Sequence, residues 1–225
     1  MLRRSCLIGV GHSLPSRVVE NSEFEKWTET SDEWISSRSG IKRRHFADPG
    51  QTTSSLAIEA AKAALLDANI KGSEIDAIIV ATSTPDTTFP SVATIVQGAL
   101  NIRSGFAFDI QAVCAGFVFA LTTAQQYIEN GVAKNILVVG SETMSKIVDW
   151  NDRSTAVLFG DGAGAVVVSK DNTTGIKHAK LCSDGKFLSS LHVNNNGINE
   201  TGTIEMMGNE VYRIAVNRLS DLAEE

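Results

Sequence analysis

The chain has 225 residues, of which 43% are hydrophobic, enough apolar surface for one large or two small globular domains. Its formal net charge of -6, without a basic tail, argues against general nucleic-acid binding, because neutralising phosphates requires a positive field. No apolar run approaches the length that crosses a membrane, so no membrane span is expected.

Strand and helix patterns alternate along the first 140 residues. The expected strands are the N-terminal run to Gly11 and residues 75–84, 106–110 and 135–140, and the expected helices are 54–70, 91–100 and the segment after 114. Alternation of this kind predicts an α/β fold, with a largely parallel sheet covered on both faces.

The segment between the first strand and the first long helix combines an aromatic side chain with basic ones. Ser31 or Asp32 can cap a short helix that ends at Gly40. Trp34 and Arg38 are four residues apart and so lie on one face of this helix. Four positive charges gather here: Arg38, Lys42, Arg43 and Arg44. One interpretation is a nucleotide site, in which an indole stacks on a base while arginines bind phosphates. The other is an exposed aromatic beside a solvated basic loop.

Cys114 lies in the turn between an expected strand and helix. The consecutive apolar residues 117–121 predict a helix buried on every side, with its N-terminus inside the protein. Unpaired N–H groups and the positive end of the helix dipole favour a thiolate there, and the small Ala115 and Gly116 leave room for a carbonyl. Cys114 is therefore a candidate nucleophile; the alternative is a buried thiol that serves as a small hydrophobe.

The other cysteines and the glycine-rich stretch indicate no metal or dinucleotide site. Cys6, Cys114 and Cys182 form no CxxC pair, so neither a disulfide framework nor a metal site is expected, and unpaired thiols suit the reducing cytoplasm. In FGDGAGAVVV the third glycine comes one position too early, and a strand follows where a dinucleotide fingerprint requires a helix. Residues 176–184 have a strand-like pattern, and MMGNEVYRIAV opens a further helix.

Four motifs, TSDEWISSRSGIKRRH, AVCAGF, NDRSTAVLFGDGAGAV and MMGNEVYRIAV, occur in this order. In order and spacing they resemble the β-ketoacyl-acyl-carrier-protein synthase III family, the initiating condensing enzymes of bacterial type II fatty-acid synthesis. The resemblance runs from the first strand to the last residue. It implies a homodimer with the thiolase-like layered αβαβα fold, in which residues 1–172 form the N-terminal half with the nucleophilic cysteine and 173–225 begin the C-terminal half.

The resemblance also implies roles for individual residues. Cys114 would accept an acyl group, expected to be acetyl, from acyl-CoA, and the full enzyme would condense it with malonyl acyl carrier protein to a 3-oxoacyl product. No cofactor is implied, because the coenzyme A thioester is a substrate. The residues implied to bind CoA are Thr30, Trp34, Arg38 and Arg153. The acyl-pocket residues are Phe89, which would reach into the partner subunit, and Met144, Phe159 and Leu191.

The sequence departs from this family in one respect. Family members use a His from a PHQAN-like segment and an Asn from a GNTSA-like segment for decarboxylation, and neither segment occurs here. The chain thus resembles a member truncated at its C-terminus, with the second half incomplete and no competence for condensation; His192 falls in a pocket-loop segment and is no substitute. Two alternatives stay open: a related thiolase-fold enzyme, such as a hydroxymethylglutaryl-CoA synthase or a starter-unit synthase, and a non-catalytic CoA-binding fragment.

Overall fold

The structure is a computed structural model that describes residues 4–171, 175–197 and 200–224. Contacts divide the chain into two compact units. The first comprises Met1–Arg17, His45–Thr143 and Asp161–Leu181, and the second comprises Val18–Arg44, Met144–Gly160 and Cys182–Glu225. The predicted boundary between residues 172 and 173 lies outside the described residues, so the division into two similar halves stays a prediction.

The first unit is built on a five-stranded sheet with the order β1-β7-β6-β4-β5. Its strands are β1 (Arg4–Ser13), β4 (Ala77–Ala81), β5 (Phe106–Ile110), β6 (Asn135–Thr143) and β7 (Asp161–Asp171). β4 runs parallel to β5 and β6, whereas β7 is antiparallel to β6 and β1. The predicted α/β class with a largely parallel sheet is confirmed. β7 is the exception because residues 144–160, which join it to β6, belong to the second unit and form no crossover helix on the sheet.

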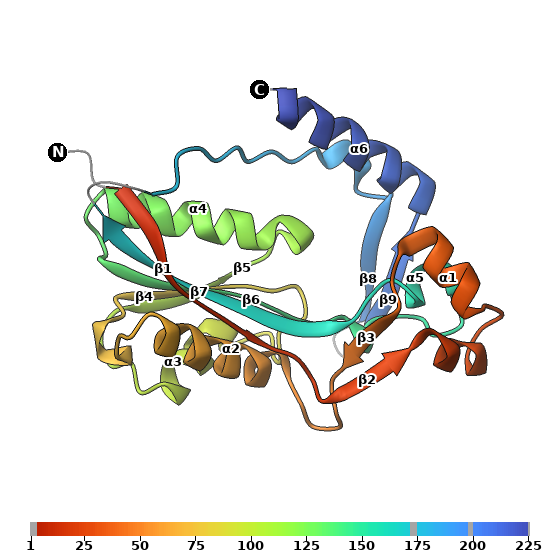
Figure 1. The fold of residues 1–225 in the computed structure, drawn as a ribbon, viewed down its shortest axis with the longest axis horizontal. Coiled ribbons are helices and arrows are strands. Elements are labelled where there is room, and N and C mark those ends of the chain that lie inside the picture. Colours follow the sequence, from red (N-terminus) through yellow and green to blue (C-terminus); the bar gives the residue numbers. More distant parts are fainter. Residues whose placement is uncertain (1–3, 172–174, 198–199, 225) are drawn as a thin grey trace. The chain divides into compact units, whose positions relative to one another are not determined.

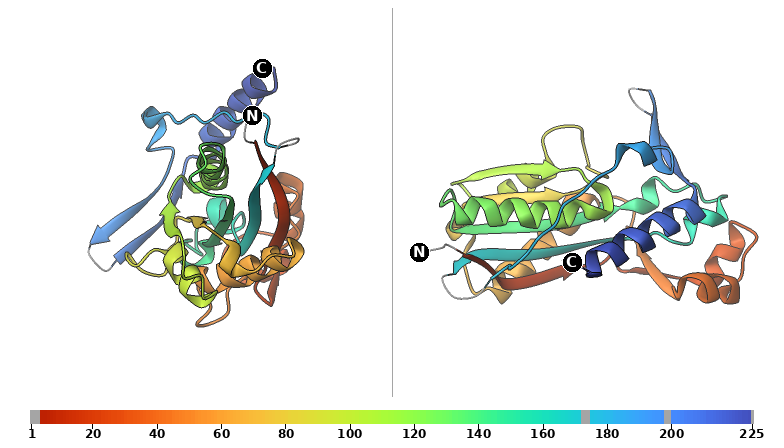
Figure 2. Two further views of the ribbon diagram at one scale, coloured as in Figure 1. Left: turned by 90° about the vertical axis from the view of Figure 1, so that its left-hand side faces the viewer. Right: turned by 90° about the horizontal axis from the view of Figure 1, so that it is seen from above.

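Helices cover both faces of this sheet (Figure 1). α2 (Thr53–Asp67) and α3 (Val92–Ala99) pack on one face and α4 (Gly116–Glu129) on the other, as Figure 2 also shows. Side chains alternate along β4: Ile78 and Val80 join the core beneath α2 and α3, and Ile79 joins the core beneath α4. One strand thus contributes to two cores, which explains its uninterrupted apolar sequence.

β1 lies directly on α2, and a glycine allows the close approach. A Cβ at Gly11 would overlap the Ala60 carbonyl oxygen and the Ala64 amide nitrogen of the helix. α2 itself begins with a reciprocal cap, in which the Thr52 and Ser55 hydroxyls each accept the backbone N–H of the other residue. The cap fixes where the helix starts, and the glycine fixes how closely the strand packs on it.

The prediction that the helix after Cys114 is buried on every side is wrong for this chain. In α4, Gly116, Ala120 and Ile128 are buried against the sheet, but Val118 is 47% exposed. Among the described residues, the sheet is the layer that packs on α4, and a helix packed on one side leaves its opposite side in solvent.

The second unit combines one long helix, α6, with shorter helices and a hairpin. They are the 3-10 helices η1 (Asn21–Lys26), η4 (Met144–Lys146) and η5 (Gly185–Phe187), the α-helices α1 (Asp32–Ser39), α5 (Arg153–Ala156) and α6 (Gly208–Glu224), and the hairpin β8 (Leu191–Gly197) with β9 (Glu200–Met206). β2 (Arg17–Glu20) pairs with β3 (Arg43–Phe46) where the units meet in sequence. None of the described helices combines the length and apolar character needed to cross a membrane.

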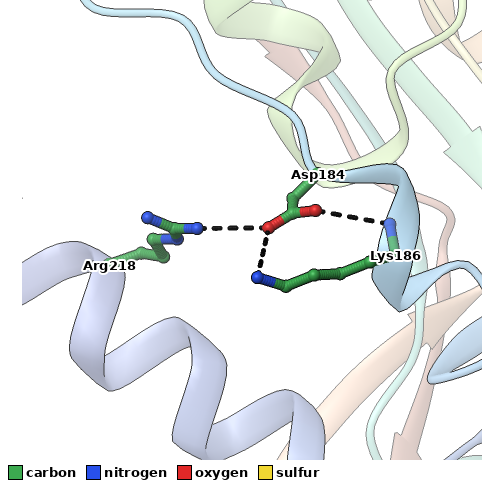
Figure 3. A network of polar contacts seen from close by, with 3 residues as sticks. All are labelled: Asp184, Lys186 and Arg218. Carbon is green, nitrogen blue, oxygen red and sulfur yellow. Dashed lines mark hydrogen bonds and ion pairs between the residues drawn. The ribbon is translucent and has the colours of Figure 1, made fainter.

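The predicted helix of MMGNEVYRIAV is confirmed as α6, whereas the predicted strand over residues 176–184 is wrong. A strand needs a neighbour for its backbone groups, and β8, the next strand along the chain, pairs with β9 instead. Asp184 fixes the end of this extended segment: its carboxylate pairs with Lys186 Nζ at 3.1 Å and with Arg218 Nη2 at 3.3 Å (Figure 3). The segment is thereby tied to α6 by exposed ion pairs, which contribute little to stability.

Arg44 is not part of a surface cluster of positive charges, contrary to the prediction. It is 7% exposed, and its guanidinium donates to Asn21 Oδ1 and to the Val157 carbonyl, each at 2.7 Å. Burial lowers the pKa of the Arg44 guanidinium, and the nearby Glu20 charge opposes this shift. Arg44 therefore joins the segment before α1 to the end of α5 inside the second unit.

Candidate active site

Cys114 lies in a tight turn between the end of β5 and the start of α4. The 3-10 helix η3 (Val113–Ala115) contains it, and α4 follows at Gly116. The thiol is exposed, which contradicts the prediction of a deeply placed helix end but leaves Sγ accessible to a substrate. The strand-turn-helix position itself is confirmed.

Val113, directly before Cys114, has a strained backbone. Its φ is +47°, a region that β-branched residues rarely adopt because Cβ crowds the backbone. Such a conformation costs on the order of 1–3 kcal/mol and persists only where the surrounding structure imposes it. The turn therefore presents Cys114 in a conformation that the local sequence would not choose by itself.

The backbone around Cys114 differs from the prediction in which amide groups are free. The Ala115 N–H donates to the Ala112 carbonyl at 3.1 Å, and the Gly116 N–H donates to the Val113 carbonyl. These two amides complete the 3-10 turn and are not unpaired donors of the helix end. Gly116 also serves packing, since a Cβ there would lie 3.1 Å from Ala81 Cβ on β4.

The other two thiols lie in different environments. Cys6 on β1 is half-buried, and burial together with the Asp171 carboxylate raises the pKa of its thiol. Cys182 is exposed in the extended segment before η5. Among the described residues, no group of three or more His, Cys, Asp or Glu could hold a metal ion.

The second unit brings together three of the four residues predicted to bind CoA. The Ser31 hydroxyl accepts the Trp34 N–H at 3.1 Å, so Ser31, one of the two predicted capping residues, caps α1. The guanidinium carbons of Arg38 and Arg153 lie 4.5 and 4.4 Å from the centroid of the Trp34 ring. Arg153 also donates from Nη1 to the Glu29 carbonyl at 2.7 Å. One indole thus gathers two cations from separate helices.

This arrangement leaves no room for a base between Trp34 and Arg153. A flat ring stacked between two groups requires a separation of about 7 Å, twice the usual contact distance of about 3.5 Å. The observed distance of 4.4 Å is that of direct contact between the arginine and the indole, with no group between them.

Thr30, the fourth predicted residue, follows Glu29, whose carbonyl binds Arg153. The Thr30 hydroxyl is buried and makes no hydrogen bond within the described residues. A buried hydroxyl without a partner is uncommon in folded proteins.

A cavity of about 490 Å³ adjoins the aromatic and basic cluster within the second unit. Trp34 and Arg38 from α1 line it together with Ser154 from α5, Met206 from β9 and Tyr212 from α6. Sequence reasoning missed the last three residues, although the motif MMGNEVYRIAV contains two of them. The volume lies in the range of small-molecule and cofactor sites.

Asp152 caps α5 and so fixes the position of Arg153, the first residue of this helix. Its carboxylate accepts the Ser154 N–H at 2.9 Å, the Ser154 hydroxyl at 2.7 Å and the Thr155 hydroxyl at 2.6 Å. Burial raises the pKa of Asp152, but the bonds from Thr155 and Ser154 together outweigh burial and lower it. The carboxylate therefore stays ionised and caps the helix at neutral pH.

Comparison with known proteins identifies one family. Residues 108–185 match the family model of 3-oxoacyl-[acyl-carrier-protein] synthase III. A β-ketoacyl-[acyl-carrier-protein] synthase III of Vesicomyosocius okutanii is 58% identical over 218 residues, which are 97% of this chain and 69% of the relative. That of Ruegeria pomeroyi is 54% identical over 231 residues, 100% of this chain and 72% of the relative. The chain belongs to the β-ketoacyl-[acyl-carrier-protein] synthase III family.

Solved structures agree with this assignment and with the predicted thiolase-like fold. The synthase III of Aquifex aeolicus matches with a TM-score of 0.89 at 45% identity and covers 93% of this chain and 67% of its own. The priming β-ketosynthase of the R1128 polyketide pathway matches with a TM-score of 0.91 at 35% identity, over 96% of this chain and 67% of its own.

The residues that the resemblance assigns to the acyl pocket of a synthase III lie on separate elements. Phe89 is 83% exposed in the connection between β4 and α3 of the first unit. In the second unit, Met144 lies in η4, Phe159 follows α5 and Leu191 begins β8. Their shared pocket stays a prediction.

His192 lies in the β8–β9 hairpin, beside a carboxylate of the paired strand. It lies on β8, where its Nε2 is 3.7 Å from a carboxylate oxygen of Glu205 on the paired strand β9. Its other ring nitrogen is buried without a partner among the described residues. The prediction that His192 is no substitute for the family's decarboxylation histidine stays a prediction.

Proposed function

We propose that Cys114 accepts an acyl group, expected to be acetyl, from acyl-CoA. We further propose that the full enzyme condenses this group with malonyl acyl carrier protein, with decarboxylation, to give a 3-oxoacyl carrier protein. The observation that carries the proposal is the exposed Cys114 on a strained turn at the head of α4, in a chain that belongs to the synthase III family. The reaction would be the first condensation of fatty-acid synthesis.

In the first half-reaction, the Cys114 thiolate attacks the thioester carbonyl carbon of acyl-CoA. A new carbon–sulfur bond forms, the tetrahedral intermediate expels CoA as a thiolate, and that thiolate takes a proton from solvent. One thioester replaces another, so bond energies change little and the site's task is to stabilise charge. The resemblance implies that the Cys114 N–H receives the oxyanion, and the engagement of the Ala115 and Gly116 amides in the turn supports this role.

The cluster around Trp34 would hold the nucleotide end of CoA. A base would stack on the indole, and Arg38 and Arg153 would bind phosphates. Thr30 would line the same entrance, as the resemblance implies. Since the Arg153 guanidinium lies 4.4 Å from the centre of the indole ring, a base that stacks between Trp34 and Arg153 has to displace this arginine first.

The proposed partners are acyl-CoA, malonyl acyl carrier protein and a second copy of the chain. Arg38, Lys42 and Arg43 are exposed and suit an acidic carrier protein, whereas the buried Arg44 does not. The exposure of Phe89 supports its proposed insertion into the acyl pocket of a partner subunit. Three free thiols support a cytoplasmic location.

A starter-unit synthase is the second candidate function. The R1128 priming ketosynthase has a TM-score of 0.91 to this chain and shares the fold that a starter enzyme requires. Both candidates use Cys114 in the same way and differ in primer and acceptor. A hydroxymethylglutaryl-CoA synthase would instead act without a carrier protein, and a non-catalytic fragment would bind CoA without acyl transfer.

Acyl transfer to Cys114 tests the proposal. The chain is incubated with acetyl-CoA, and peptide mass spectrometry locates any acetyl thioester. We expect the adduct on Cys114, none on Cys6 or Cys182, and none in the Cys114→Ala variant. CoA binding without an adduct would favour the non-catalytic fragment, and an adduct on all three thiols would show non-specific chemistry.

A further inference from the structure

The connection between β4 and α3, residues 82–91, carries Phe89 and is fixed at both ends by a carboxylate. At its start, Glu142 on β6 accepts the Ser83 N–H and the Ser83 hydroxyl, each at 2.8 Å. Glu142 also accepts the Thr84 hydroxyl, and the Thr82 hydroxyl at 3.3 Å. All four donors are neutral, and all belong to the first residues after β4.

At the end of the connection, Asp109 on β5 accepts the first amides of α3. The Val92 N–H lies 2.7 Å and the Ala93 N–H 2.8 Å from its two carboxylate oxygens. Bonds from backbone N–H groups to a carboxylate are stronger than neutral ones, so each end of the connection is held tightly. Phe89 therefore projects from a segment that is fixed on both sides, although its own side chain is exposed.

The same two anchors lie at the edge of the sheet where Cys114 is found. The Thr82 N–H donates to the carbonyl of Ile110, the last residue of β5 before the cysteine turn. Asp109 directly precedes Ile110, and Ala81 directly precedes Thr82 and contacts the position of Gly116 at the head of α4. A displacement at Thr82–Thr84 would therefore be transmitted to the turn whose Val113 is already strained.

We propose that Glu142 and Asp109 are positioning residues that hold segment 82–91 against the Cys114 turn and so fix the nucleophile and Phe89 relative to each other. Neither carboxylate has to touch substrate for this role. The connection to acyl selectivity rests on the proposed function, because it requires that Phe89 contact the acyl group. The effect on Cys114 itself does not require it.

The test compares Glu142→Ala, Glu142→Gln and Asp109→Asn in the full 225-residue chain. Asp76→Asn is a matched control, because Asp76 also binds two backbone amides, of Lys134 and Asn135 at 2.7 and 3.1 Å, but at the opposite end of β4 and β6. Hydrogen exchange of residues 82–91 and iodoacetamide alkylation of Cys114 are measured, with Cys6 and Cys182 as internal references. Neither measurement depends on acyl transfer.

We expect exchange in segment 82–91 to accelerate about tenfold in Glu142→Ala, the size expected for losing a charged hydrogen-bond acceptor. Cys114 alkylation should slow about fivefold, because the turn no longer holds the thiol at the helix end, while the reference thiols keep their rates. Glu142→Gln retains one oxygen for the Ser83 N–H and should restore part of the rate. If the alanine variant fails to fold, the exchange and alkylation rates of Glu142→Gln test the proposal instead.

Two results would overturn the proposal. One is faster exchange with an unchanged rate of Cys114 alkylation, which would show that Glu142 stabilises segment 82–91 alone. The other is an equal effect of Asp76→Asn on the alkylation of Cys114. If the chain also forms the acetyl thioester, the ratio of hexanoyl to acetyl transfer should change in the Glu142 and Asp109 variants and stay constant in the control. Failure of acetyl transfer in the unsubstituted chain would count against the proposed function and leave the alkylation result valid.

Discussion

Three cysteines with three environments make the reactivity of Cys114 measurable inside one protein. Cys114 is exposed at the head of α4, Cys182 is exposed in an extended segment, and Cys6 is half-buried beside Asp171. The raised pKa of Cys6 means that less of its thiol is ionised at neutral pH, so it should react slowest. We expect Cys114 to be alkylated fastest, and peptide mass spectrometry over a range of pH checks the order. Equal rates for Cys114 and Cys182 would contradict the expected order.

Trp34 offers a second prediction for a single residue. Trp34→Ala should weaken CoA binding by about 1–3 kcal/mol if a base stacks on the indole as on other aromatic platforms. Trp34→Phe keeps a stacking surface and should lose less. Calorimetry on folded protein measures both variants, and unchanged affinity in Trp34→Ala would return the residue to the role of a packed surface aromatic.

At the scale of elements, the contact of β1 with α2 depends on Gly11. Gly11→Ala places a Cβ against helix backbone that cannot move aside, so we expect a loss of about 1–3 kcal/mol in the free energy of unfolding. Gly98→Ala in α3 is the matched control, because a Cβ there meets nothing within 4 Å. This substitution should raise the free energy of unfolding by about 0.5–1 kcal/mol. Denaturant melts measure both; a neutral Gly11→Ala would show that the strand can move away from the helix.

The elements of the sheet could be predicted because each depends on a local pattern. Alternating strands and helices, the Ser31 cap and the Gly40 stop are properties of neighbouring residues. The apolar run 117–121 was misleading, because burial of α4 depends on a second layer that the run itself does not specify. The strand predicted over residues 176–184 was wrong for the same reason. A strand-like pattern needs a neighbouring strand, and β8 and β9 pair with each other.

The candidate site could be predicted only in part. The motif with Cys114 identified the turn, but the strained Val113 and the engaged amides result from three-dimensional packing. The Trp34 cluster joins residues more than a hundred positions apart, and only the resemblance connected them. Arg44 was misassigned because a basic residue in a basic run gives no sign of burial.

For the whole molecule, the two half-reactions should separate. The thiol and the aromatic-basic cluster that serve acyl transfer are present, whereas the PHQAN-like and GNTSA-like segments of the family do not occur in the 225 residues. Losing one preorganised oxyanion donor lowers a rate by about 10² to 10³, and here two groups are absent. We expect at most slow acyl transfer to Cys114 and no detectable condensation.

Labelled acetyl-CoA and malonyl carrier protein separate these outcomes, because acyl-enzyme and acetoacetyl product can be followed independently. Cys114→Ala is the control for both. Condensation at an ordinary enzymatic rate that disappears in a His192 variant would show that His192 is a base, contrary to the prediction.

The covered indole of Trp34 has a consequence for the time course of binding. If Arg153 must release the Glu29 carbonyl and turn away before a base can stack, opening becomes a separate step before association. The observed rate in a stopped-flow experiment would then rise with CoA concentration and level off at the opening rate, instead of rising linearly. Arg153→Ala would remove the plateau and would also weaken the final complex. The same side chain would then slow the entry of CoA into the empty site and hold CoA once it is bound.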